Sequence, residues 1–92
     1  MTKLGEKLKE LGYHEDSTYP GIYKKDYKNT FVYSEIYCEY ERYSNPIKIK
    51  EYHMHVHFTY LNISKDDILN ALKANIEMER DLDILKELED GK

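Results

Sequence analysis

The chain has 92 residues, of which 40% are hydrophobic and 35% charged, and this composition predicts one small globular domain spanning residues 1–92. Its net charge of −4 disfavours general binding to phosphate backbones or anionic membranes. No apolar run could span a bilayer, no apolar secretory signal opens the chain, and the lone Cys38 cannot form an internal disulfide, so we expect a cytoplasmic protein.

The first predicted element is an amphipathic helix over about residues 3–11. Its apolar stripe consists of leucines at i, i+4 and i+7, namely Leu4, Leu8 and Leu11. Gly12 follows where a left-handed helix cap belongs, and Tyr13 supplies the hydrophobic residue that closes such a cap. Residues 14–21 are polar and end in a Pro-Gly turn signal, so we expect a loop there.

Three antiparallel strands are expected to follow this loop. A short strand is predicted at residues 22–24, and a longer one from residue 30 to about residue 41. A hairpin loop over residues 43–46 then leads into a third strand at residues 47–61.

The two longer strands each show which side should face the core. The third strand alternates apolar and histidine residues with period two, the pattern of a strand buried on one side only. Its core side is predicted to carry Met54, Val56, Phe58 and Tyr60. Its other side carries His53, His55 and His57. In the second strand, the core side is predicted to carry Val32, Ile36 and Cys38. Its other side carries Tyr33, Glu35, Tyr37 and Glu39.

A final helix is predicted over residues 65–88, with Ser64 as its N-cap and acidic residues in its first turn. One side of this helix carries Ile68, Leu72 and Ile76. A side rotated by roughly a quarter turn carries Met78, Leu82, Leu85 and Leu88. One straight helix cannot bury both groups against a flat sheet, so we expect its distal half to pack either on the first helix or on another subunit, forming a homodimer.

These elements predict an α+β fold in the order α-β-β-β-α. The three strands form an antiparallel sheet, and the two amphipathic helices cover only one of its faces. The other face is then open, and it carries the outward residues of the two longer strands together with Glu51.

The histidines offer one candidate for a metal site. Neighbouring histidines on one strand face have Cβ atoms about 6.6 Å apart, so two of them can share an ion but three on a flat strand do not converge. Glu35 would lie opposite His55 with a three-residue hairpin loop and opposite His53 with a five-residue loop. A metal-binding protein or hydrolase could then use Zn²⁺ or Fe²⁺ held by a neighbouring pair among His53, His55 and His57 together with Glu35. We favour the other interpretation, in which these are solvated side chains and the protein holds no metal or cofactor.

Other chemistry finds less support in the sequence. Cys38 is predicted to face the core, where a free cysteine is inert, and no glycine-rich phosphate loop is present, so we expect a protein that is not an enzyme. The order α-β-β-β-α is shared by double-stranded RNA binding domains, and Tyr33 and Tyr37 could stack on bases. However, the last helix starts with acidic residues 66–67 and glutamates neighbour both tyrosines, which disfavours RNA or DNA binding.

The open face fits a protein interface best. The chain contains 10 tyrosines, and tyrosine is enriched at interface hot spots. A surrounding set of carboxylates complements a basic partner surface. The predicted partner-binding residues are Tyr33, Glu35, Tyr37, Glu39, His53, His55 and His57.

Two segments carry a resemblance to a known group of proteins. They are residues 7–13, and residues 67–71 together with Met78, Asp81 and Leu82. In these helices the chain resembles small hypothetical accessory proteins of temperate phages and prophages of Gram-positive bacteria. The resemblance implies an accessory protein that binds and blocks a host or defence protein, as anti-CRISPR proteins do.

Overall fold

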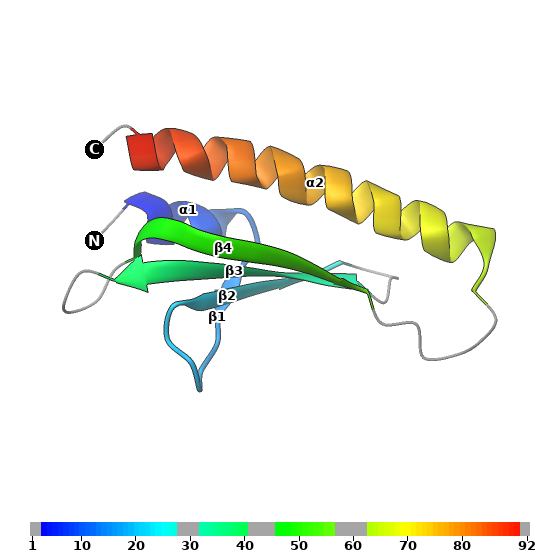
Figure 1. Ribbon diagram of the computed structural model, residues 1–92, viewed down its shortest axis with the longest axis horizontal. Coiled ribbons are helices and arrows are strands. Elements are labelled where there is room, and N and C mark those ends of the chain that lie inside the picture. Colours follow the sequence, from blue (N-terminus) through cyan, green and yellow to red (C-terminus); the bar gives the residue numbers. More distant parts are fainter. Residues whose placement is uncertain (1–2, 28–31, 41–45, 57–62, 91–92) are drawn as a thin grey trace.

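The computed structural model describes residues 3–27, 32–40, 46–56 and 63–90. Its elements, in chain order, are α1 (Lys3–Glu10), β1 (His14–Glu15), β2 (Ile22–Asp26), β3 (Val32–Tyr40), β4 (Pro46–Val56) and α2 (Lys65–Asp90). The strands form one antiparallel sheet in the order β1-β2-β3-β4. Both helices lie on the same face of this sheet (Figure 1). The predicted α+β class is therefore confirmed.

The predicted three-stranded sheet is wrong, because the sheet has a fourth strand. His14 and Glu15, which we expected in a loop, pair with Lys24 and Tyr23 of β2. The chain reverses between β1 and β2 through a turn in which Oδ1 of Asp16 accepts hydrogen bonds from the backbone of residues 18 and 19, at 2.7 and 3.0 Å. This turn brings a two-residue segment, too short to show a strand period, back to the edge of the sheet.

Both predicted helix caps are present. At the end of α1, Gly12 has a φ of 99°, Tyr13 N donates to Leu8 O at 2.9 Å, and Gly12 N donates to Lys9 O at 3.1 Å. At the start of α2, Asp67 N donates to Ser64 Oγ at 3.1 Å and Ser64 N donates to Oδ2 of Asp67 at 3.0 Å. This reciprocal pair is a capping box, with aspartate in the position that glutamate commonly takes.

The register between β3 and β4 decides between the two predicted hairpins. Glu35 pairs with His53 and Tyr33 pairs with His55, which is the arrangement predicted for a five-residue connection. Tyr40 pairs with Pro46, so β4 begins one residue earlier than predicted, and two register shifts interrupt the ladder near this end. Residues 41–45 and the predicted strand residues beyond 56, including Phe58, Tyr60 and His57, lie outside the described ranges.

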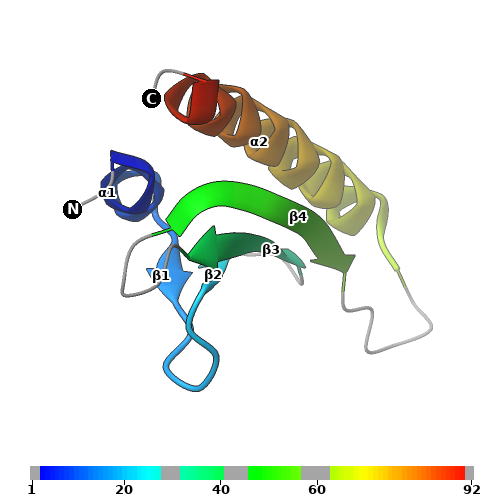
Figure 2. The same cartoon turned by 60° about the vertical axis from the view of Figure 1, so that its left-hand side comes forward.

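The main core lies between the sheet and the C-terminal half of α2. Leu8 of α1, Ile36 of β3 and Leu85 of α2 are fully buried together, and Met78 and Leu82 join the same cluster. The alternative in which the distal half of the last helix packs on the first helix is therefore confirmed, and Figure 2 shows the two helices side by side over the curved sheet. Neither helix has the long apolar stretch that crossing a bilayer requires, within the ranges described.

A polar network is buried between the sheet and α2. Lys25 of β2 reaches across this layer, and its Nζ lies 3.0 Å from Oδ2 of Asp81 and 3.0 Å from Oε1 of Glu77. Tyr13 donates its hydroxyl to Asp81 at 3.3 Å and accepts a hydrogen bond from Ser34 at 3.3 Å. Burial lowers the pKa of Lys25, but the hydrogen bonds to the two carboxylates outweigh it and raise the pKa overall. Burial raises the pKa of Tyr13 far above its ordinary range, so its hydroxyl stays protonated and can donate.

Removing the buried end of this network should cost far more stability than removing its exposed end. The Asp81 side chain is 7% exposed and that of Glu77 is 52% exposed. Asp81→Ala leaves Lys25 and Tyr13 without their shared partner in a buried layer, so we expect a loss of about 3 kcal/mol in urea unfolding. Glu77→Ala is the matched control on the same lysine and should cost less than about 1 kcal/mol. Equal losses for the two variants would contradict this assignment.

Candidate functional site

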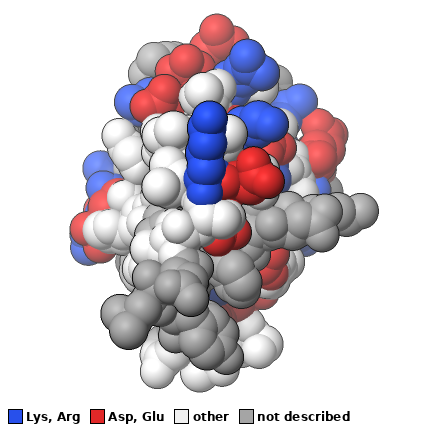
Figure 3. All heavy atoms as spheres, turned by 90° about the vertical axis from the view of Figure 1, so that its right-hand side faces the viewer, with Lys and Arg blue, Asp and Glu red and all other residues white. Residues whose placement is uncertain are grey.

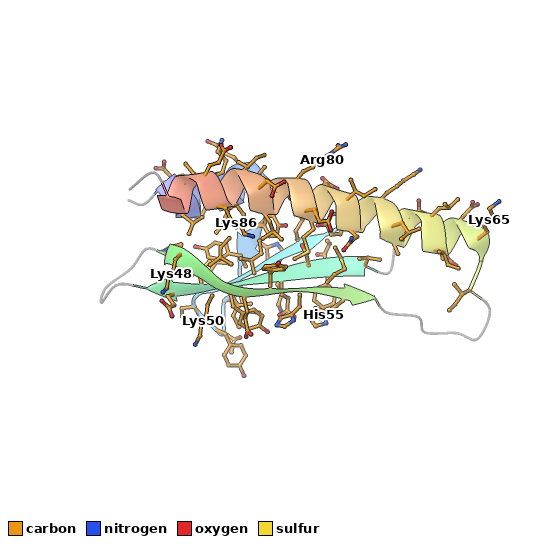
Figure 4. The ribbon with its side chains drawn as sticks, turned by 45° about the horizontal axis from the view of Figure 1, so that its top comes forward. Lys48, Lys50, His55, Lys65, Arg80 and Lys86 are labelled. Atoms are coloured by element: carbon orange, nitrogen blue, oxygen red, sulfur yellow. The ribbon has the colours of Figure 1, made fainter. Side chains whose placement is uncertain are left out.

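The candidate site is the outer face, by which we mean the side of the sheet that faces away from both helices (Figure 4). Strand alternation sends every second side chain of β3 and β4 to this side. The structure therefore brings together six of the seven residues predicted to bind a partner: Tyr33, Glu35, Tyr37, Glu39, His53 and His55. The seventh, His57, lies outside the described residues.

Glu35 occupies the centre of the outer face. It lies on β3, an inner strand of the sheet, and its side chain is only 10% exposed. Its Oε1 contacts Nε2 of His55, while its Oε2 accepts a hydrogen bond from the Tyr37 hydroxyl at 3.4 Å and lies 3.9 Å from Nζ of Lys24. A carboxylate this deeply placed requires such partners, because burying an unpaired charge is costly. Glu35 therefore organises the surrounding side chains instead of projecting toward solvent.

Two tyrosine–histidine pairs flank Glu35. Tyr33 and His55 are direct cross-strand neighbours, and their rings stack with centroids 4.7 Å apart and planes 13° apart. Tyr37 and His53 are diagonal neighbours that meet edge to face, with centroids 5.5 Å apart. Aromatic pairs of this kind hold their rings in defined orientations. The outer face therefore presents a largely pre-oriented aromatic surface.

The outer face is less acidic than the sequence suggested. Lys24 Nζ lies 3.2 Å from Oδ2 of Asp16, in addition to its contact with Glu35, and Lys48 Nζ lies 3.2 Å from Oε2 of Glu39. Lysines 48 and 50 project from the same side of the sheet as His55 in Figure 4. We did not anticipate these lysines as site residues, although the signal exists in the sequence, because Lys24 alternates with the buried Tyr23 and so has to point outward.

Three of the four candidate metal ligands, Glu35, His53 and His55, lie within the described residues. His53 and His55 have ring centroids 6.1 Å apart. Their carboxylate contacts differ, because Glu35 contacts Nε2 of His55 whereas Oε2 of Glu51 lies 3.8 Å from Nε2 of His53. Among the residues that the structure describes, no group of three or more His, Cys, Asp or Glu is arranged to hold a metal ion. A set that includes His57 lies outside this range.

A second feature lies at the edge of the sheet, where β4 and α2 enclose a groove of about 320 Å³. It is lined by Tyr52, His53, Met54, Asn75, Met78, Glu79 and Leu82. Sequence patterns do not predict this groove, because its lining comes from two elements, β4 and α2, that meet only in the folded domain. Its lining includes the apolar side chains of Met54, Met78 and Leu82, which suit an apolar side chain of a ligand or partner.

Comparison with protein-family models, with curated proteins and with solved structures finds no match for this chain. Its function is therefore inferred from its own residues.

The rim of the outer face contains a carboxylate that should make stability depend on pH. Hydrogen bonds from the backbone N–H groups of Tyr19 and Thr18, together with Lys24, hold the pKa of Asp16 below its usual value. A carboxyl whose pKa is lowered on folding stabilises the fold above the unfolded-state pKa of about 3.9, and this contribution is lost as pH falls through the folded-state pKa.

Asp16→Asn should therefore unfold at lower urea than the natural chain at pH 7, and the difference should shrink as pH falls below about 4. Asparagine keeps an oxygen that accepts the two backbone hydrogen bonds, so the variant isolates the charge. A difference that stays constant from pH 7 to pH 2.5 would contradict the role of Asp16.

Proposed function

We propose that this protein is a non-enzymatic interaction module that binds another protein through its outer face. The observation that supports the proposal most directly is the aromatic surface around Glu35, on a sheet face that neither helix covers. Tyr33 and Tyr37 are partly buried, so their neighbours hold them in place while part of each side chain stays accessible to a partner. A fully buried tyrosine would instead serve only the packing of the domain.

This arrangement suits binding energetically. Ordering a flexible side chain at an interface costs roughly 0.5–1.5 kcal/mol of binding free energy. Tyr33 stacks on His55 and Tyr37 contacts His53 edge to face, so both tyrosines are already partly ordered in the free protein and lose less entropy on binding. Tyrosine also offers a large apolar ring with a hydroxyl that tolerates water, so the same surface is stable when free and when covered. Tyr33 and Tyr37 are therefore the proposed anchors.

We infer that the partner presents a basic surface. Glu39 is matched by Lys48 at 3.2 Å, and because both side chains are exposed an incoming arginine could replace this lysine. Glu51 is exposed, and its Oε2 lies 3.8 Å from Nε2 of His53. With the net charge of −4, these groups favour approach by a cationic protein.

The resemblance of the helices to phage and prophage accessory proteins suggests which partner this is. We propose a host or defence protein in the cytoplasm, inhibited in the manner of anti-CRISPR proteins. Two alternatives from other functional classes are a metal-binding protein or metal-dependent hydrolase and an RNA- or DNA-binding domain. The homodimer predicted through the distal half of the last helix is not carried forward, because Met78, Leu82 and Leu85 of that half are buried in the core of the domain. Pairing through another part of α2 is a separate proposal, because α2 lies on the opposite side of the sheet from the outer face.

The proposal is tested by capturing partners from the lysate of a candidate bacterial host and then measuring the affinity of a purified stoichiometric partner. Truncating two anchors, Tyr33→Ala with Tyr37→Ala, should weaken that affinity at least about 100-fold, because each hot-spot tyrosine contributes on the order of 1.4 kcal/mol or more. Tyr19→Ala is the matched control, since Tyr19 is 63% exposed and lies in the β1–β2 turn. Circular dichroism verifies that both variants keep the fold.

Two results would contradict the proposal. One is a stoichiometric partner that binds the double variant as tightly as the natural chain. The other is a purified protein that carries bound Zn²⁺ or Fe²⁺ removed by His55→Ala, because that result would favour the metal alternative.

A further inference from the structure

The N-terminal half of α2 has two apolar sides, and among the described residues only one of them packs against the rest of the domain. Ala74 is buried against Tyr27 and Val32. On the far side of the same turns four large apolar side chains are exposed by 42% to 56%: Ile68, Leu69, Leu72 and Ile76. We call these four residues the α2 stripe. At 100° per residue, Leu72 and Ala74 point about 160° apart, so the stripe faces away from the sheet.

The α2 stripe continues into charged residues with a regular spacing. Lys65, Leu69, Leu72, Ile76 and Glu79 follow one another at intervals of 4, 3, 4 and 3 residues. This is the spacing at which one helix presents a seam to another helix. The seam is basic at its start, apolar at its centre and acidic at its end, where Asp83 continues the series. The end residues Lys65, Glu79 and Asp83 are all exposed.

We propose that the α2 stripe docks on the α2 stripe of a second copy of this chain, with the two helices antiparallel. Leu72 lies midway between Lys65 and Glu79, so a two-fold axis near Leu72 places the seam residue Lys65 of each helix against Glu79 of the other. A parallel pair would place Lys65 against Lys65 and Glu79 against Glu79. The distribution of charge therefore selects both the orientation and a partner with the same sequence.

The surroundings of the stripe leave room for a second copy. α2 forms the outermost layer on its side of the domain, and no described element lies over it (Figure 1). Viewed from the end at which α2 begins, uncharged side chains form a continuous area bordered by lysines and carboxylates (Figure 3). The outer face lies on the opposite side of the sheet, so the dimer would leave both copies of it accessible. This inference is therefore independent of the proposed function.

The dimer should be weak and concentration-dependent. The α2 stripe spans residues 68–76, about 12 Å of helix. A helix segment of this length is too short to bury the 1,200–2,000 Å² of a standard protein interface. Single apolar residues scattered over a protein surface are common and need no explanation, but the α2 stripe groups four of them on one side of a helix. We expect the natural chain to pass from monomer to dimer between about 1 μM and 1 mM.

Sedimentation velocity of the full chain across that range tests the proposal. Leu72→Lys should weaken dimerisation at least tenfold, because it places two ammonium groups at the centre of the seam. Ile84→Lys is the matched control, since Ile84 is 39% exposed on the same helix but lies outside the seam, and it should dimerise like the natural chain. Circular dichroism confirms that both variants stay helical.

Charge reversal tests the orientation. Lys65→Glu should weaken the dimer, and combining Lys65→Glu with Glu79→Lys and Asp83→Lys should restore it in the antiparallel arrangement. Restoration by the triple variant supports the proposal. If the natural chain stays monomeric at about 1 mM, the proposed dimer is wrong and the α2 stripe has to bind a different partner. A dimer that Leu72→Lys leaves intact, or one that the triple variant does not restore, would also overturn it.

Discussion

The contact between Lys25 of β2 and Asp81 of α2 fixes how the last helix sits on the sheet. Both side chains are almost fully buried, and Tyr13 adds its hydroxyl to the same carboxylate. A buried carboxylate has to meet its partners, so the rotation of α2 about its own axis is no longer free. With Asp81 turned toward Lys25, Met78, Leu82 and Leu85 enter the core. The α2 stripe is then left on the outside.

The same constraint decides the character of the sheet. Because the helices and the polar network cover one face, the opposite face has to be stable in water without a covering layer. β3 shows the contrast within two residues: Ser34 is fully buried in the network beneath α2, while Glu35 meets His55, Tyr37 and Lys24 on the other side. The outer face is thus held by its own cross-strand contacts, and this gives its tyrosines fixed orientations.

The molecule therefore offers two different surfaces on opposite sides of one thin sheet. The outer face is aromatic and bears charges that are mostly matched, which suits recognition of another protein. The α2 stripe is aliphatic, and the seam that contains it has Lys65 on one side and Glu79 on the other, which suits antiparallel pairing with a second copy. If both are used, a dimer would display two outer faces, and a partner with repeated sites would bind it more tightly than it binds one domain.

The sequence by itself determined the features that depend on neighbours along the chain. The alternation in residues 52–56 and 32–39 identified the outward Tyr33, Glu35, His53 and His55, and Gly12 and Ser64 marked helix boundaries where the caps are found. These signals are readable because strand pleat, left-handed caps and capping boxes are local geometry.

Only the tertiary structure decided the contacts between distant segments. The two-residue β1 is too short to carry a periodic pattern, and it forms because β2 offers it an edge. The choice of His53 over His55 as the cross-strand pairing partner of Glu35 depended on the hairpin connection and its bulges. Lys25 and Asp81 are 56 residues apart, and each by itself resembles an ordinary surface charge. Their pairing, which sets the rotation of α2, follows from the packing of the whole domain, because a buried charge finds its partner only when the surrounding elements are in place.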